Sequence, residues 1–298
     1  MPELPEVQTT ASGLDRVVRN LSIVDVWTDY DSPFFKGSET IKDPKYFALF
    51  RKQVQGRKIL HVSRRAKNVL INLRGNFTVL VHMKMTGHLL YGDYDRSDSF
   101  NRHIHLIFYL SNGKNIELSD LRKFAKVTLV KTDEFHLSTH LKDIGPEPLE
   151  KEFTFAVFKK RIQTRPKGKI KPVLMDQTIL AGVGNIYADE SLWRAGIHPE
   201  QIVSSIPEKK LKELYEAIRT TLLKGIDFGG DSMSDYRNIH GKRGKFQEEH
   251  QAYRRHGKKC GKKGCKGFIT RIVVAGRGTH FCPIHQVQTK QPRPQRKH

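Results

Sequence analysis

The sequence predicts an α+β fold of several domains, with a β-rich N-terminal domain, a helical middle and a metal-binding hairpin near the C-terminal end. Three observations predict this fold. Short apolar runs separated by turn residues occupy the first 150 positions, and apolar residues at helical spacing follow them. All three cysteines lie within 23 positions near the end. With 298 residues, of which 37% are hydrophobic, the chain is long enough for two or three compact units.

Residues 1–150 are expected to form the first domain, a β-sandwich or a barrel. Its strands are short apolar segments separated by turn residues, and the clearest of them cover 69–73, 78–82 and 105–110. One helix is expected before these strands, from about Pro5 to Leu14. Proline suits a first helical position because its missing N–H would have no partner there in any case.

Residues 151–240 are expected to form a helical domain, after a linker with two prolines and a glycine over 144–149. Apolar residues recur at helical spacing in four segments, over 153–162, 173–177, 186–195 and 208–224. The last segment follows Pro207, which is a helix-start signal. A third domain is expected over 241–290, and a disordered basic tail over 291–298.

The chain is strongly basic, with a formal net charge of +22. Residues 241–298 alone contain sixteen Lys and Arg against two acidic residues. Such an excess favours nucleic acid as the partner, because binding to a polyphosphate releases counterions. An acidic membrane is the less favoured partner, since no long apolar span and no signal peptide are found. We therefore expect a cytoplasmic protein with no membrane association.

The cysteines and a following histidine have the spacing of a zinc site, Cys260-x4-Cys265-x16-Cys282-x2-His285. Zinc takes four such ligands in a tetrahedron, and two short-spaced pairs joined by a hairpin supply them. The connecting segment is expected to form two strands around a turn that contains glycine. A zinc site is favoured over three free thiols in a basic loop. The spacing leaves the fourth ligand open among His285, His280 and His256.

The N-terminus offers a possible nucleophile. Removal of Met1 would leave Pro2 with a free secondary amine, and chain-terminal amines titrate near pH 7.7–8.0 in model compounds. Such an amine can attack an electrophilic carbon and form an iminium. Glu3 and Glu6 are near enough in sequence to act as acid or base. The local pattern alone also fits a simpler reading, in which carboxylates near a helix start compensate the helix dipole.

Five motifs, in order along the chain, resemble the formamidopyrimidine-DNA glycosylase and endonuclease VIII family. The first is the N-terminal string Met-Pro-Glu-Leu-Pro-Glu-Val, and the others cover residues 64–67, 170–192, 234–247 and 276–279. The resemblance extends over residues 1 to about 287. It implies an N-terminal β-sandwich, a helix–two-turns–helix domain and a zinc finger, with double-stranded DNA held as substrate.

The resemblance also implies catalytic roles. Pro2 matches the family's nucleophile, which attacks C1′ of a nucleotide flipped out of the duplex. Glu3 matches its general acid/base, and Lys67 matches a lysine that contacts phosphates and donates a proton. Arg277, at the tip of the finger hairpin, matches an arginine that grips the same phosphates. Glu6 is expected to be structural and to accept hydrogen bonds that hold the Pro2 loop.

Three side chains match the family's wedge, which fills the gap left by the flipped base: Met85, Arg122 and Phe124. Met and Phe are apolar wedges of the kind that unstack DNA, and Arg can donate to the unpaired base. This combination resembles the purine-specific branch of the family. Asn185 is expected to bind phosphate at a helix start, and His103 and Lys167 are further expected DNA contacts.

The function implied is excision of oxidised purines, 8-oxoguanine and formamidopyrimidines, followed by β,δ-elimination at the abasic site. We expect one structural zinc ion and a monomer associated with the nucleoid. The alternatives are an endonuclease VIII-like enzyme for oxidised pyrimidines, a non-catalytic damaged-DNA-binding protein of the same fold, and a basic zinc-ribbon protein that binds RNA. His285 departs from the cysteine usual in the family, and the loop after Gly230 gives no base preference.

Overall fold

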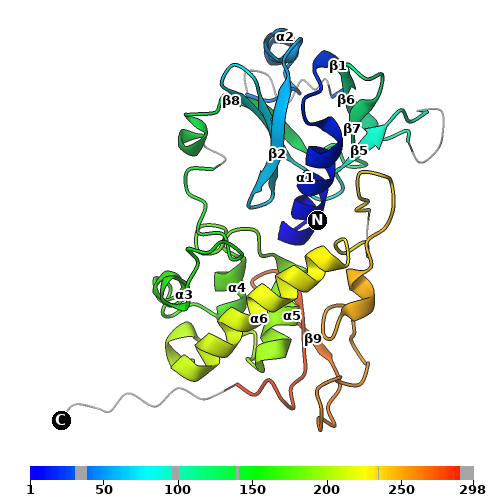
Figure 1. The fold of residues 1–298 in the computed structure, drawn as a ribbon. Coiled ribbons are helices and arrows are strands. Elements are labelled where there is room, and N and C mark those ends of the chain that lie inside the picture. Colours follow the sequence, from blue (N-terminus) through cyan, green and yellow to red (C-terminus); the bar gives the residue numbers. More distant parts are fainter. Residues whose placement is uncertain (31–38, 96–100, 139–140, 234, 289–298) are drawn as a thin grey trace. The chain divides into compact units, whose positions relative to one another are not determined.

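The computed structural model describes residues 1–30, 39–95, 101–138, 141–233 and 235–288 (Figure 1). The predicted tail over 291–298 and Ser234, the first residue of the 234–247 motif, lie outside these residues. The chain divides into two compact units. Unit 1 is Met1–Asp143 with Lys224–Glu248, and unit 2 is Ile144–Leu223 with the chain from Glu249 onward. Each unit consists of two separate stretches of the sequence, whereas each of the four predicted domains is one continuous range. The four ranges stay a prediction.

Unit 1 contains two antiparallel four-stranded sheets, which confirms the predicted β-sandwich. The first sheet has the order β1-β6-β7-β5. Its strands are β1 (Ile23–Thr28), β6 (Ile104–Leu110), β7 (Asn115–Ser119) and β5 (His88–Gly92). The second sheet has the order β2-β3-β4-β8. Its strands are β2 (Ile59–Arg65), β3 (Asn68–Leu73), β4 (Phe77–His82) and β8 (Lys126–Lys131). Apolar residues of both sheets form one buried core, among them Val26, Phe108, Ile71 and Val79.

Two helices pack on this core. Helix α1 (Leu4–Val18) buries Val7, Ala11, Leu14 and Val18, which recur at helical spacing on one face. It is longer at its C-terminal end than predicted, because Val18 continues the apolar face by one turn. Helix α2 (Pro44–Val54) was not predicted. It begins with a side-chain cap, in which the carboxylate of Asp43 accepts a hydrogen bond from the Tyr46 N–H at 2.9 Å.

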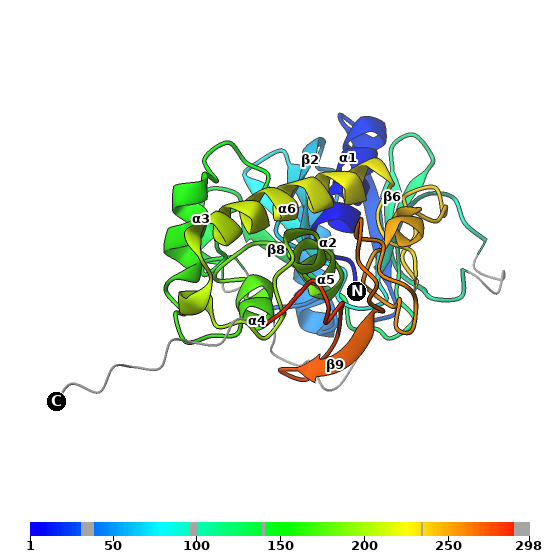
Figure 2. The ribbon, with the colours of Figure 1, turned by 90° about the horizontal axis from the view of Figure 1, so that it is seen from below.

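Unit 2 contains the predicted helices and the predicted hairpin. The helices are α3 (Phe155–Ile162), α4 (Ile170–Met175), α5 (Asn185–Ala195) and α6 (Glu208–Asp227), of which α6 continues into unit 1. The hairpin strands β9 (Thr270–Val274) and β10 (Arg277–Phe281) pair in antiparallel register, with Arg277 opposite Val274 at the turn. Helix α5 packs against both α4 and β10 (Figures 1 and 2). Three short 3-10 turns complete the described elements: η2 (Phe135–Leu137), η3 (Val203–Ser205) and η4 (Phe246–Glu249).

Among the described helices, none has both the length and the apolar character needed to span a membrane.

Candidate active site and metal centre

Pro2 and Glu3 are buried at the start of α1. Glu3 is only 2% exposed and is the residue that caps the helix. Its side chain accepts a hydrogen bond from the backbone of Glu6, and the Glu6 carboxylate accepts one from the Glu3 N–H at 2.7 Å. This reciprocal pair is a capping box, formed here by two glutamates. It gives the backbone next to Pro2 a defined conformation.

Glu6 also connects this helix start to the segment after α6. Its second carboxylate oxygen accepts a hydrogen bond from the Asp231 N–H at 2.7 Å, and its carbonyl accepts one from the Tyr236 hydroxyl at 3.1 Å. A Cβ on Gly230 would lie 2.9 Å from Cγ of Glu6, so the chain needs glycine at this position. Burial raises the pKa of the Tyr236 hydroxyl, which therefore stays a hydrogen-bond donor at neutral pH. Neither Asp231 nor Tyr236 was predicted as part of this site.

Lys67 lies in the two-residue turn between β2 and β3, where Arg65 pairs with Asn68. Ala66, the first residue of the turn, has φ of 50°. Lys67 is 7% exposed, so most of its side chain is packed against the unit. The hairpin is tied to α1, because the Arg64 guanidinium donates to the side-chain oxygen of Gln8 at 2.9 Å.

The three predicted wedge side chains come together on the surface of unit 1. The Arg122 guanidinium lies 3.3 Å from the sulfur of Met85 and 4.4 Å from the centre of the Phe124 ring. Met85 is 42% exposed and Phe124 is 48% exposed. Two exposed apolar side chains therefore contact one exposed arginine on this surface, which is compatible with the predicted wedge.

Arg277 is exposed at the tip of the β9–β10 hairpin, and the next residue binds α5. The side-chain amide of Asn185, the first residue of α5, donates to the Gly278 carbonyl at 3.2 Å. The Lys171 ammonium lies 2.6 Å from Asp189 and donates to the hydroxyl of Thr279 at 2.8 Å. The Lys171 and Asp189 side chains are 1% and 0% exposed. A buried ion pair that also binds the hairpin therefore fixes the position of its tip.

Helix α5 carries a second buried carboxylate, on Glu190. It accepts hydrogen bonds from the backbone N–H groups of Gln251, Ala252 and Tyr253, at 2.8 to 2.9 Å. These residues precede the segment with Cys260 and Cys265, which we call the cysteine-containing loop. Burial raises the pKa of the Glu190 carboxyl above its ordinary value. Lys171, Asp189 and Glu190 lie within the 170–192 motif but were not predicted as site residues, although charged residues among the apolar positions of a helix can signal buried polar contacts.

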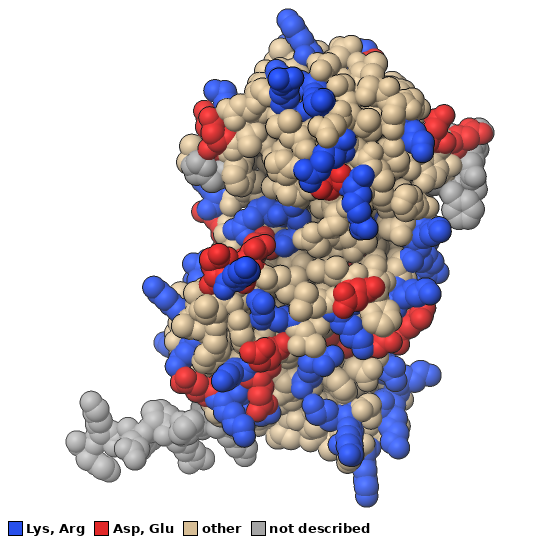
Figure 3. Space-filling model, viewed as in Figure 1, with Lys and Arg blue, Asp and Glu red and all other residues tan. Residues whose placement is uncertain are grey.

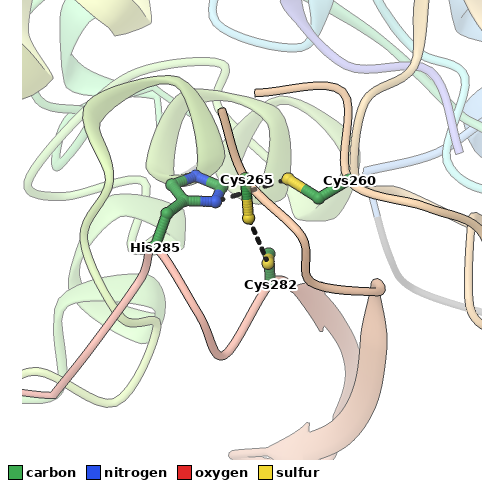
Figure 4. A group of neighbouring side chains, drawn as sticks. All are labelled: Cys260, Cys265, Cys282 and His285. Atoms are coloured by element: carbon green, nitrogen blue, oxygen red, sulfur yellow. Dashed lines mark hydrogen bonds between the residues drawn. The ribbon is translucent and has the colours of Figure 1, made fainter. Parts of the chain in front are cut away.

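The four predicted metal ligands lie together in unit 2, with ligand atoms all within 4.8 Å of one another. Figure 4 shows their side chains pointing toward a common centre. The Cys265 and Cys282 sulfurs are 3.6 Å apart, and the Cys260 sulfur is 3.4 Å from Nδ1 of His285. A tetrahedral zinc ion with Zn–S of about 2.3 Å and Zn–N of about 2.0 Å would hold its ligand atoms about 3.5 to 3.8 Å apart. The cluster therefore fits such an ion.

The surroundings of His285 prepare it to bind a metal through Nδ1. Its Nε2 lies 3.0 Å from the Trp193 carbonyl, which accepts a hydrogen bond and leaves Nδ1 with its lone pair free. Burial lowers the pKa of the imidazole, which favours the neutral form that binds metals. The Gly267 N–H, at 3.3 Å, lowers the pKa of the Cys265 thiol. The other two histidines left open by the sequence are not in this cluster, and His280 instead contacts Asp189.

The remaining predicted DNA contacts lie on the surface. Lys167 is exposed in the loop before α4, at the rim of a hollow of about 460 Å³ that Arg165 and Lys169 also line. His103 is half-buried before β6, where the Arg102 guanidinium donates to its ring at 3.2 Å. Lys and Arg side chains are spread over both units on the face in Figure 3. They gather at the lower end of that view, around the cysteine-containing loop, and the sequence has no acidic residue after Glu249.

Comparison with known proteins identifies the family. The model of the formamidopyrimidine-DNA glycosylase N-terminal domain matches residues 1–127, and that of the formamidopyrimidine-DNA glycosylase H2TH domain matches residues 144–237. The chain belongs to the formamidopyrimidine-DNA glycosylase family. The family resemblance and the fold class predicted from the sequence are thereby confirmed.

Curated members of the family and solved structures match over nearly the whole chain. Formamidopyrimidine-DNA glycosylases of Pelotomaculum thermopropionicum and Herpetosiphon aurantiacus are each 40% identical over 286 residues, which cover 96% of this chain and 99% and 100% of theirs. Among structures, Lactococcus lactis Fpg in complex with DNA containing an abasic site has a TM-score of 0.84 and 34% identity. A complex of the same enzyme with DNA containing Fapy-dG has a TM-score of 0.83. Each covers 96% of this chain and 100% of the other.

Proposed function

We propose that this protein is a base-excision-repair DNA glycosylase with abasic-site lyase activity, and that it removes oxidised purines from double-stranded DNA. The observation that carries the proposal is the full-length family match, which includes the buried Pro2–Glu3 start of α1. The solved relatives from Lactococcus lactis hold DNA with Fapy-dG or an abasic site. We further propose that it acts as a monomer on the nucleoid, and that the four sequence ranges are its functional domains.

The chemistry begins at Pro2 after removal of Met1, because the nitrogen of Pro2 is an amide while Met1 is attached. The lone pair of the free amine attacks C1′ of the flipped nucleotide, and the bond from C1′ to the base breaks. The base leaves with the electron pair of that bond and takes up the proton that the nitrogen of Pro2 loses. The ring oxygen leaves C1′ with a proton from Glu3, and an iminium forms between Pro2 and C1′. The iminium acidifies the proton on C2′, and loss of that proton expels the 3′ phosphate and leaves a conjugated iminium. Loss of a further proton, from C4′, then expels the 5′ phosphate.

Three residues are proposed to hold the phosphates on which this chemistry depends. Lys67 is largely buried in its turn, so its ammonium has few positions available and can act as a proton donor at a defined place. Arg277 presents an exposed guanidinium at a hairpin tip. Asn185 begins α5, where backbone N–H groups and the helix dipole favour an anion. His103 and Lys167 are proposed as further backbone contacts.

The wedge of Met85, Arg122 and Phe124 is proposed to replace the flipped base. An arginine between two exposed apolar side chains suits an unpaired cytosine, because its planar fork can donate to cytosine O2 and N3. This supports an oxidised purine opposite cytosine as substrate. One observation favours a second substrate class, since a further Lactococcus lactis structure holds DNA with an oxidised pyrimidine.

The metal is proposed to be zinc, held by Cys260, Cys265, Cys282 and His285. Its contribution would be structural, since four protein ligands leave no open position for water or substrate. The residues around it keep the β9–β10 hairpin in place through α5, and the hairpin carries Arg277.

The test is covalent trapping. Protein is mixed with duplex DNA carrying 8-oxoguanine opposite cytosine, and borohydride is added to reduce the iminium. We expect a stable protein–DNA adduct linked through the nitrogen of Pro2, and no adduct with the same duplex carrying guanine. Mass spectrometry of the adduct locates the linkage. Absence of an adduct in protein that has lost Met1, or linkage to a lysine alone, contradicts the proposal.

A further inference from the structure

Two loops of unit 1 carry the wedge, and each has buried ends and an exposed tip. In the first, residues 83–87, Met83 is buried and Met85 is exposed. Its turn is tight, because a Cβ on Gly87 would lie 2.4 Å from the Met83 carbonyl oxygen. In the second, residues 120–125, Phe124 is exposed between buried ends.

Both loops contain a lysine in the left-handed region, Lys84 with φ of 55° and Lys123 with φ of 53°. Such conformations are costly for residues other than glycine and persist where the surroundings hold them. The wedge loops therefore need support from buried groups.

A chain of hydrogen bonds joins the two loops beneath their tips. The Arg122 N–H donates to the hydroxyl oxygen of Thr86 at 3.1 Å, and the Thr86 hydroxyl donates to Oδ1 of Asp120 at 2.5 Å. Thr86 is 8% exposed and Asp120 is fully buried. The Thr86 hydroxyl thus acts both as acceptor and as donor. Among the described contacts, it is the one side chain of the 83–87 loop that bonds to the buried Asp120 carboxylate of the other loop.

Asp120 gathers further support through its other oxygen. Oδ2 accepts hydrogen bonds from the Ala125 N–H at 2.7 Å and from the Tyr30 hydroxyl at 3.1 Å. Burial, together with the Asp120 carboxylate, raises the pKa of Tyr30, so this hydroxyl remains a donor. The buried Lys42 ammonium donates to the carbonyl of Lys123 at 2.5 Å, which holds the strained residue in place.

We infer that Thr86 and Asp120 are positioning residues for base extrusion: they lock the two wedge loops to each other so that Met85, Arg122 and Phe124 are aimed before DNA binds. The inference rests on the proposed function. Both residues are buried, so neither touches the DNA, and they act through the loops they hold. If the wedge loops are already ordered, inserting them into the base stack loses less conformational entropy.

Removing the link should slow extrusion and leave the chemistry intact. Thr86→Val keeps the shape of the side chain but leaves the Arg122 N–H and one Asp120 oxygen without their partner. Leaving buried polar groups unsatisfied destabilises the locked loops, and we expect extrusion to slow about tenfold, which corresponds to about 1.4 kcal/mol. The measurement is stopped-flow fluorescence of 2-aminopurine placed next to 8-oxoguanine, which brightens as the neighbouring base unstacks. Cleavage at a preformed abasic site should fall less, because no stacked base has to be removed.

Thr78→Val is the matched control. Thr78 is a buried threonine of β4 whose hydroxyl also makes two hydrogen bonds, to Asn72 at 2.9 Å and to Thr132 at 2.8 Å, away from the wedge. Both variants should lose similar thermal stability, but only Thr86→Val should slow extrusion, and Thr86→Ser should restore it. Equal extrusion rates for Thr86→Val and Thr78→Val would overturn the inference.

A measurement on the unmodified protein covers the case in which Thr86→Val does not fold. In DNA-free protein, the backbone amides of Arg122 and Ala125 should exchange with solvent slowly, although the neighbouring Leu121 is 53% exposed. Exchange as fast as that of Leu121 would show that the loops are not locked, and would overturn the inference. Failure of the proposed function has a different signature, because the wild-type protein would then give no borohydride adduct at all.

Discussion

Replacing Glu6 with Gln tests whether the hydrogen bonds of the Glu6 carboxylate hold the chain next to Pro2 in place. Glu6 is 1% exposed, and each of its two oxygens lies 2.7 Å from a backbone nitrogen, one of Glu3 and one of Asp231. Glutamine offers one oxygen and one amino group. Whichever way the amide is turned, one of the two N–H groups faces an amino group that cannot accept its hydrogen bond.

We expect this isosteric substitution to lower the free energy of unfolding of unit 1 by a large amount. A hydrogen bond to a charged group contributes about 1.5–3 kcal/mol, and the substitution removes one such bond and weakens the other. Glu6 also lies in the first turn of α1, where its negative charge interacts favourably with the helix dipole. We expect unit 1 to lose about 3 kcal/mol, which corresponds to about 6–12 °C in the melting midpoint of a unit of this size.

The two tryptophans make the assay specific. Trp27 lies in unit 1 and Trp193 in unit 2, so in a Trp193→Phe background Trp27 fluorescence follows the melting of unit 1 alone. The control is Glu134→Gln, because among the described residues the Glu134 carboxylate contacts Lys131 in an exposed ion pair, and its loss should change the midpoint little. The borohydride adduct should also form more slowly in Glu6→Gln. A midpoint within about 2 °C of the reference protein, together with unchanged trapping, would refute the reasoning.

Three further outcomes are expected. Protein that retains Met1 should form no adduct, whereas Glu3→Gln should bind DNA normally and release no base; intact mass, binding and turnover check both, and full activity with Met1 present would remove Pro2 from the mechanism. The logarithm of DNA affinity should fall steeply and linearly with the logarithm of salt between about 50 and 200 mM, and a flat plot would contradict a phosphate clamp. His285→Ala should lower zinc content and DNA affinity together while His285→Cys preserves both; elemental analysis and binding check this, and stoichiometric metal in His285→Ala would reject the ligand.

The elements with strong apolar periodicity could be predicted from the sequence. Strands β3, β4 and β6 and helices α5 and α6 occur where the patterns placed them, within three residues at each end. Helix α2 was missed because only Phe50 and Val54 are buried along it, so its apolar repeat is weak. The sequence does contain a helix-start signal, Asp43 followed by Pro44, but this signal alone does not predict a helix without an apolar repeat after it.

The metal site shows where local spacing is sufficient and where it is not. The cysteine spacing predicted three ligands that the structure places together, because short-spaced pairs at the base of a hairpin can approach one another only in a few ways. The choice among three histidines depended on packing. His285 is directed at the cluster by the Trp193 carbonyl, whereas the backbone and ring of His280 are held by Asp189 on α5.

The sequence by itself determined the family, the fold class and the types of chemical group available: a proline near the terminus, carboxylates beside it and a cysteine cluster. Only the tertiary structure decided what holds these groups in place. Glu6 binds Asp231 across 225 positions, Lys171 binds Thr279 across 108, and Thr86 binds Asp120 across 34. Residue spacing specifies contacts within a helix turn or a hairpin. Bonds over these separations depend on sheet order and helix packing, which bring together loops that no local pattern relates.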